Sequence, residues 1–122
     1  MSRRRKLVPA LEVERSALRM VGLAMRAGRL VLGTTAVREA ARHGKLSGAL
    51  IATDATANAR NRLLPLLDAM DVPVASCATT RKLGLAVGKE RLAVVGITDV
   101  GFARRIMADL PVETWSDRSE NC

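Results

Sequence analysis

The sequence predicts an α/β protein: a three-layer α/β/α sandwich on a four-stranded mixed sheet. Short apolar runs alternate along the chain with longer amphipathic stretches, which is the pattern of strands separated by covering helices. The chain has 122 residues, of which 48% are hydrophobic, and this is enough to form one domain with a real core. Aromatic residues make up only 2%, so we expect a core of aliphatic side chains.

Each expected element has a residue that starts it and another that stops it. Helices are expected to begin at Ser, Thr or Asp, whose side-chain oxygens can cap the first turn, and several end at a glycine. In order, the expected strands are Leu30–Leu32, Ala49–Thr53, Val72–Cys77 and Leu92–Ile97. The first two expected helices run from Ser16 to about Ala27 and from Thr34 or Thr35 to His43. A third follows Thr56 and has a kink or break near Leu64 caused by Pro65. The last two run from Thr79 to Val87 and from a cap at Thr98 or Asp99 to about Leu110.

Both ends of the chain lack this periodicity. Met1–Glu14 contains the basic run Arg3–Lys6 and is predicted to be a flexible arm. Residues 111–122 show no helix or strand pattern and are predicted to be a disordered tail. The predicted domain therefore spans residues 15–110.

Positive charge is concentrated in the first third of the chain. The total is 20 Lys and Arg against 12 Asp and Glu, a net charge of +8. Up to Lys45 there are eleven basic and three acidic residues, whereas from Leu46 onward there are nine of each. Part of this excess forms a stripe along the first expected helix, at Arg15, Arg19 and Arg26. Evenly spread charge would indicate a solvated surface, but this segregation favours a polyanionic partner, nucleic acid before membrane.

One strand–glycine–helix unit combines this charge with an end that attracts anions. The strand before Gly33 leads directly into a helix, whose first backbone N–H groups have no partner within the helix. Such an end favours phosphate, and we expect Thr34 or Thr35 to cap one of those donors. The same helix carries cations on one face, namely Arg38, Arg42 and Lys45.

Residues typical of catalysis or metal binding occur without partners at a useful spacing. Asp54 follows a strand, but a carboxylate at that place is most often a helix cap. Cys77 and Cys122 form no metal or redox spacing, and His43 is the single histidine. We therefore predict a protein that is not an enzyme and needs no cofactor and no metal, with Cys77 as a buried structural thiol. No run reaches the roughly 20 apolar residues of a membrane span, and no signal peptide is visible, so the predicted location is cytoplasmic.

Three segments together resemble a known family. They are LAMRAGRLVLGTTAV, ALIATDATANARNRL and VPVASCATTRKLGLAVGKERLAVVGITDVGFARRI, of which RKLGLAVGKE is the most specific. They are similar to the bacterial YlxQ-like branch of the L7Ae ribosomal protein family, the kink-turn RNA-binding type, from about Leu18 to Leu110. The resemblance implies an α/β/α sandwich that binds structured RNA, ribosomal RNA among the candidates, without catalysis.

The resemblance also implies where RNA would lie: against the start of the second helix and the loop before the fourth strand. The predicted RNA-binding residues, from charge and resemblance together, are Arg29, Gly33, Thr34, Thr35, Arg38, Arg42, Gly88, Lys89, Glu90 and Arg91. The chain departs from the kink-turn pattern at three positions. The best-studied members of the family have Asn-Glu in place of Thr35-Ala36, and Lys in place of Glu39.

A second class of function remains open. Relatives of the same fold include protein-interaction modules, which would use an acidic or apolar patch instead of a basic one. The net charge of +8 favours RNA over that alternative. We expect the protein to be a monomer.

Overall fold

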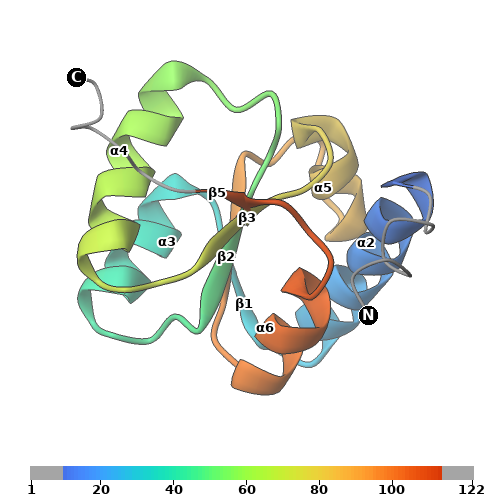
Figure 1. Cartoon of the computed structure of the whole chain (residues 1–122), viewed down its shortest axis with the longest axis horizontal. Coiled ribbons are helices and arrows are strands. Elements are labelled where there is room, and N and C mark those ends of the chain that lie inside the picture. The colour runs from blue at the N-terminus through green and yellow to red at the C-terminus, as the bar shows by residue number, and fades with distance from the viewer. Residues whose placement is uncertain (1–9, 114–122) are drawn as a thin grey trace.

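The computed structural model describes residues 10–113 (Figure 1). Helices and strands alternate along them, as the sequence predicted. In chain order the elements are α2 (Ala10–Arg26), β1 (Leu30–Leu32), α3 (Thr34–Arg42), β2 (Gly48–Ile51), α4 (Ala57–Ala69), β3 (Val74–Ser76), α5 (Thr80–Ala86), β4 (Val94–Ile97), α6 (Val100–Met107) and β5 (Val112–Glu113).

The strands form one mixed sheet in the order β1-β4-β2-β3-β5. Strand β4 is antiparallel to both β1 and β2, and β3 is parallel to β2, so β1, β2 and β3 run in the same direction. Antiparallel pairing sets Leu30 opposite Ile97 and Ala49 opposite Gly96. The ends of three strands and the start of a fourth therefore meet at one edge of the sheet.

Helices cover both faces of this sheet, which confirms the predicted three-layer architecture. One face packs against α2, α5 and α6, with the buried side chains of Val21, Leu83 and Ile106 among those that fill this layer. The other face packs against α3 and α4 through residues such as Val37, Leu63 and Leu67. The expectation of an aliphatic core is correct for the described buried residues, and the partly buried Phe102 packs against the layer of α2, α5 and α6.

The expectation of four strands is wrong, because β5 adds a fifth. It pairs antiparallel with β3, with Val74 opposite Glu113. The Glu113 carboxylate also forms an ion pair with the Arg60 guanidinium of α4. A two-residue edge strand is too short to show a period of two, so these residues appear in the sequence as part of the tail. The rest of the predicted tail lies outside the described residues.

Two helices differ from their predicted limits. Helix α2 begins at Ala10, so Ser16 lies inside it and does not cap it. Val13, which packs against the core, extends the apolar face of that helix toward its start, and part of the predicted arm is therefore helical. Helix α4 continues through Pro65 without a break. Buried Leu64 and Leu67 anchor the helix on both sides of the proline, and this packing outweighs the lost hydrogen bond. Residues 1–9 lie outside the described part.

Candidate functional site

The loops at one edge of the sheet form the candidate site, called the loop end below: residues 33–35, 52–56, 77–80 and 88–93. Hydrogen bonds hold these loops together across the sheet. The Gly33 N–H donates to the Val94 carbonyl at 3.1 Å, and the Ala52 N–H donates to the Ala93 carbonyl at 2.8 Å. The carboxyl ends of parallel strands are where α/β proteins place their ligands, so the topology itself selects this edge.

Gly33 gives the loop end an uncapped helix start. Its φ of 92° and ψ of 160° lie in a region that favours glycine, and it is the N-cap of α3 with no side-chain hydrogen bond to the first turn. The expected cap by Thr34 or Thr35 is therefore wrong, because both residues are already inside the helix. Nothing lies within 4 Å of where a Gly33 Cβ would be, so the N-cap position itself is uncrowded.

The other helix starts with a described N-cap are closed by side chains. The hydroxyl of Thr56 accepts the Ala59 N–H in α4, and a Thr79 hydroxyl and an Asp99 carboxylate do the same for α5 and α6. Among these four helices, α3 alone leaves its first turn without a side-chain acceptor. An anion bound at this start would therefore compete with no capping side chain.

The loop before β4 is held tightly against α5. The Lys89 N–H donates to the Gly84 carbonyl at 2.8 Å, and the Leu92 N–H donates to the Thr80 carbonyl at 2.9 Å. Gly88 turns the chain with a φ of 81°. The side chains of Lys89, Glu90 and Arg91 are exposed beyond this anchored backbone. The loop therefore presents two cations from a fixed position.

Asp54 fastens two loops of the loop end to each other. One carboxylate oxygen accepts the Thr80 N–H at 2.7 Å, and the other accepts the Thr80 hydroxyl at 3.3 Å. Asp54 is thus not the N-cap of a helix, since Thr56 caps α4 and Thr79 caps α5; it accepts the first backbone N–H of α5 from a neighbouring loop. A small hollow beside it is also lined by Thr56, Thr80 and Arg91. The arrangement follows from the sheet, because Asp54 and Thr80 come after neighbouring parallel strands, whose ends meet.

Replacing Asp54 with alanine should weaken the loop end measurably. The loss of a charged acceptor from a helix start costs about 1 kcal/mol, since the Thr80 N–H then has only water as a partner. Urea unfolding should show this loss for Asp54→Ala and a smaller one for Asp54→Asn, which keeps an acceptor oxygen. Asp68→Ala, at an exposed acidic position of α4, is the control and should have little effect. Equal stabilities of the Asp54 and Asp68 variants would contradict the stabilising role of the contact between Asp54 and Thr80.

The structure brings together most, but not all, of the predicted RNA-binding residues. Those at the loop end are Gly33, Thr34, Thr35, Gly88, Lys89, Glu90 and Arg91. Arg38 lies one turn into α3, and its guanidinium donates to the backbone carbonyl of Arg62 in α4. Arg29 precedes β1 and Arg42 ends α3, so both lie toward the opposite edge of the sheet. The Arg29 carbonyl there accepts the Thr98 N–H at 3.0 Å.

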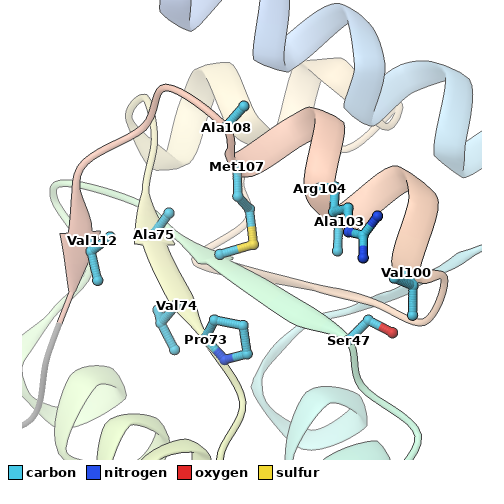
Figure 2. A pocket seen from close by; sticks show the side chains of 10 residues that line it. All are labelled: Ser47, Pro73, Val74, Ala75, Val100, Ala103, Arg104, Met107, Ala108 and Val112. Atoms are coloured by element: carbon cyan, nitrogen blue, oxygen red, sulfur yellow. The ribbon is translucent and has the colours of Figure 1, made fainter. Parts of the chain in front are cut away.

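A second concave surface lies on the sheet face that α6 covers (Figure 2). It is a groove of about 470 Å³ between α6 and the strands β3 and β5. Its walls include Met107 and the exposed side chains of Val100 and Val112, and Arg104 is the charged residue among those that line it. Such an apolar groove offers little to a polyanion. It is the surface that the protein-interaction alternative would use.

Cys77 is buried at the end of β3, as the sequence predicted. Burial raises the pKa of its thiol from the ordinary 9.0 to about 11, with a further contribution from the Glu14 carboxylate. A thiol that keeps its proton is a poor nucleophile. Among residues 10–113, no three His, Cys, Asp or Glu side chains gather in a way that could hold a metal ion. No helix among the same residues is long and apolar enough to span a bilayer.

The raised pKa of Cys77 predicts a loss of stability at high pH. Between pH 9 and 11 the unfolded chain releases this proton while the folded protein keeps it, so raising the pH favours unfolding. The free energy of unfolding should fall across this window by an amount on the order of 2 kcal/mol and should lose nothing more from this group above pH 11. Urea unfolding of the protein and of Cys77→Ala at pH 8 and at pH 11 isolates this effect. Identical pH dependence of the two proteins would contradict it.

Comparison with known proteins connects this fold to one family. A family profile described as "Ribosomal protein L7Ae/L30e/S12e/Gadd45 family" matches residues 15–107. The RNA-binding protein YlxQ of Bacillus subtilis (strain 168) is 30% identical over 89 residues, which are 73% of this chain and 89% of that protein. The protein of the same name from Enterococcus faecium is 32% identical over 89 residues, covering 73% of this chain and 85% of that one.

Two solved structures share the architecture. A protein of unknown function from Bacillus halodurans C superposes with a TM-score of 0.73 and 31% identity, covering 76% of this chain and 94% of its own. The Giardia lamblia 15.5kD RNA binding protein gives a TM-score of 0.70 over 80% of this chain and 87% of its own. Its identity is 19%, so this likeness concerns the fold alone.

Proposed function

Because this chain belongs to the ribosomal protein L7Ae/L30e/S12e/Gadd45 family, we propose that it binds structured RNA through the loop end and catalyses no reaction. The observation that carries the proposal is the pairing of two features at that edge. The start of α3 at Gly33 has no side-chain cap, and Lys89 and Arg91 are exposed on the loop that hydrogen bonds fix beside it. The name of the two curated relatives, RNA-binding protein, supports the same partner.

Each feature has a role in holding the RNA backbone. Backbone N–H groups at the start of α3 would donate to phosphate oxygens, helped by the helix dipole. The Lys89 and Arg91 side chains would neutralise phosphates on the other side of the bend. Such contacts position the RNA without reading its sequence. Arg29 and Arg42, toward the opposite edge, have no part in this proposal, and Arg38 supports the site by joining α3 to α4.

The residues at the start of α3 favour recognition by shape. Reading a base edge needs paired donors and acceptors, which Asn or Glu supply. Thr35 offers one hydroxyl, Ala36 offers none, and the exposed Glu39 carboxylate repels phosphate. We therefore infer that the protein recognises bent or kink-turn-like RNA with weak discrimination among the base pairs at the bend. The family description makes ribosomal RNA the first candidate to test. The cytoplasmic location and the monomeric state stay predictions.

The dependence of binding on salt tests the proposal. The two phosphate contacts of Lys89 and Arg91 should give a log–log slope of roughly −2 for a structured RNA bound at the loop end, because binding releases counterions. Lys89→Ala/Arg91→Ala should reduce the magnitude of that slope by about 2. Titrations from 50 to 200 mM salt by fluorescence anisotropy provide the measurement. A flat salt dependence, or a double variant with an unchanged slope, would remove the proposal.

The apolar groove of Figure 2 supports a different function, docking of a protein partner between α6 and β5. RNA binding predicts that the purified protein carries bound nucleic acid, whereas docking of a protein partner does not. Bound nucleic acid raises the ratio of absorbance at 260 and 280 nm, and a high-salt wash should lower it again. A ratio typical of pure protein, unchanged by salt, would favour the protein-interaction function.

A further inference from the structure

We propose that RNA held at the loop end also extends across α5 onto α2, where Arg15, Arg19 and Lys82 contact the phosphates of a duplex stem. This surface is called the α2–α5 ridge below. The inference rests on the proposed function and extends its site. It gives a role to Arg15 and Arg19 of the basic stripe on α2, which are not part of the loop end.

The α2–α5 ridge is continuous with the loop end. Helices α2 and α5 lie side by side, and a Cβ added to Gly22 of α2 would be 3.4 Å from the Ala86 carbonyl of α5 (Figure 1). Ala86 is the last residue of α5, and the loop with Lys89 and Arg91 follows two residues later. A shallow groove of about 400 Å³ joins the two helices, lined by Arg15, Leu18, Arg19, Lys82, Leu85 and Ala86.

The charges on the α2–α5 ridge are available to a ligand. The side chains of Arg15 and Arg19 are exposed, and within residues 10–113 neither has a carboxylate at ion-pair distance. Lys82 is 3.5 Å from the Glu14 carboxylate, which is partly buried, while its own side chain is 53% exposed. Because the Lys82 side chain is more than half exposed, this pair contributes little to stability, and the other N–H donors of the ammonium can contact a phosphate.

The position of the other cations points to the same surface. The net charge of +8 falls entirely within the first 45 residues. In that part of the chain, Arg38 is held by the Arg62 carbonyl and Arg42 lies toward the opposite edge of the sheet. Among the described cations of this stretch, Arg15 and Arg19 line the groove against α5.

The dimensions suit a stem that continues from a bend. A helix such as α5 is about 10 Å wide with its side chains, so cations on its two sides are close enough to contact phosphates of the same duplex. Duplex RNA is recognised mainly by its shape and its phosphates, which needs no base-reading side chain here. Leu85, which is 68% exposed between the cations, can pack against the sugars of the stem. An acidic protein segment is the other ligand that such a surface could take.

A matched pair of double variants tests the α2–α5 ridge. Arg15→Ala/Arg19→Ala removes two exposed arginines from α2, and the control Arg104→Ala/Arg105→Ala removes two from α6. All four substituted residues lie in helices, where alanine is well tolerated because it is a good helix former. Circular dichroism would verify that both double variants are folded. Each protein is titrated with a bent RNA that has one stem of about 11 base pairs and with the same RNA cut back to the bend.

We expect the α2 variant to lose about tenfold in affinity for the long-stem RNA and the magnitude of its salt slope to fall by about 2. Its affinity for the short RNA should not change, and the α6 control should match the unaltered protein on both. Equal behaviour of the two double variants, or an equal loss on both RNAs, would overturn the proposal. Unchanged RNA binding by the α2 variant would leave the acidic protein segment as the ligand of this surface.

Failure of the extension onto α2 can be told apart from failure of the proposed function at the loop end. If the unaltered protein binds neither RNA, or if Lys89→Ala/Arg91→Ala keeps full affinity for both, the loop end itself is not the RNA site. If the loop variant loses both RNAs while the α2 variant loses neither, the loop end stands and only the extension onto α2 is wrong.

Discussion

Gly84→Ala is expected to destabilise the protein and to weaken RNA binding at the same time. A Cβ on Gly84 would lie 2.9 Å from the Arg91 backbone N and Cα and from the Lys89 carbonyl oxygen. Backbone atoms cannot move aside as a flexible side chain can, so the loop that carries Lys89 and Arg91 must shift. Overpacking of this kind costs about 1–3 kcal/mol, which outweighs the gain of up to about 1 kcal/mol from replacing a helical glycine.

The control for this prediction is a second glycine inside a helix. A Cβ on Gly22 of α2 would be 3.4 Å from the Ala86 carbonyl, an ordinary contact, so Gly22→Ala should be neutral or mildly stabilising. Urea unfolding should therefore shift in different directions for the two variants. For Gly84→Ala we also expect about a tenfold loss of affinity for structured RNA. If the two glycine variants are equally stable, the loop is not held by its contact with α5.

Changing the start of α3 toward the family pattern should turn shape recognition into recognition of a specific motif. The triple variant Thr35→Asn/Ala36→Glu/Glu39→Lys supplies an amide and a carboxylate for base edges and removes a repulsive charge. Glu39 is 64% exposed and Ala36 lies beside a hollow between α3 and β1, so both positions have room for the new side chains. We expect a tenfold to hundredfold preference for a kink turn, or about 1.4–2.7 kcal/mol.

The measurement is a competition titration with a kink turn and with the same RNA whose guanine–adenine pairs have been replaced. Glu39→Lys alone is the control, because it should strengthen binding to both RNAs without creating a preference. If the unaltered protein already prefers the kink turn a hundredfold, recognition by shape alone is wrong and the base contacts come from other residues.

Glycines made part of the candidate site predictable from the sequence. Gly33 follows an apolar strand and Gly88 follows the end of a helix, and both adopt the positive φ that turns of this kind require. The need for glycine comes from the backbone conformation of the turn itself, which is local, so the sequence alone is enough to predict it. The link between Asp54 and Thr80 joins residues 26 positions apart, so no local pattern reveals it. It becomes visible only once β2 and β3 are known to be parallel neighbours.

The sequence by itself determined the element types, the aliphatic core and the concentration of positive charge near the start of the chain. These follow from side-chain periodicity and composition, which are local properties. Only the tertiary structure decided which cations share a surface. Strand β1 carries Gly33 about 13 Å from Arg29, and the nine residues of α3 carry Arg42 back again, away from the loop end. Packing of α5 against α2 places Arg15 and Arg19 beside Lys82. This packing buries apolar side chains of both helices, and such burial between segments far apart in the chain cannot be read from a local pattern.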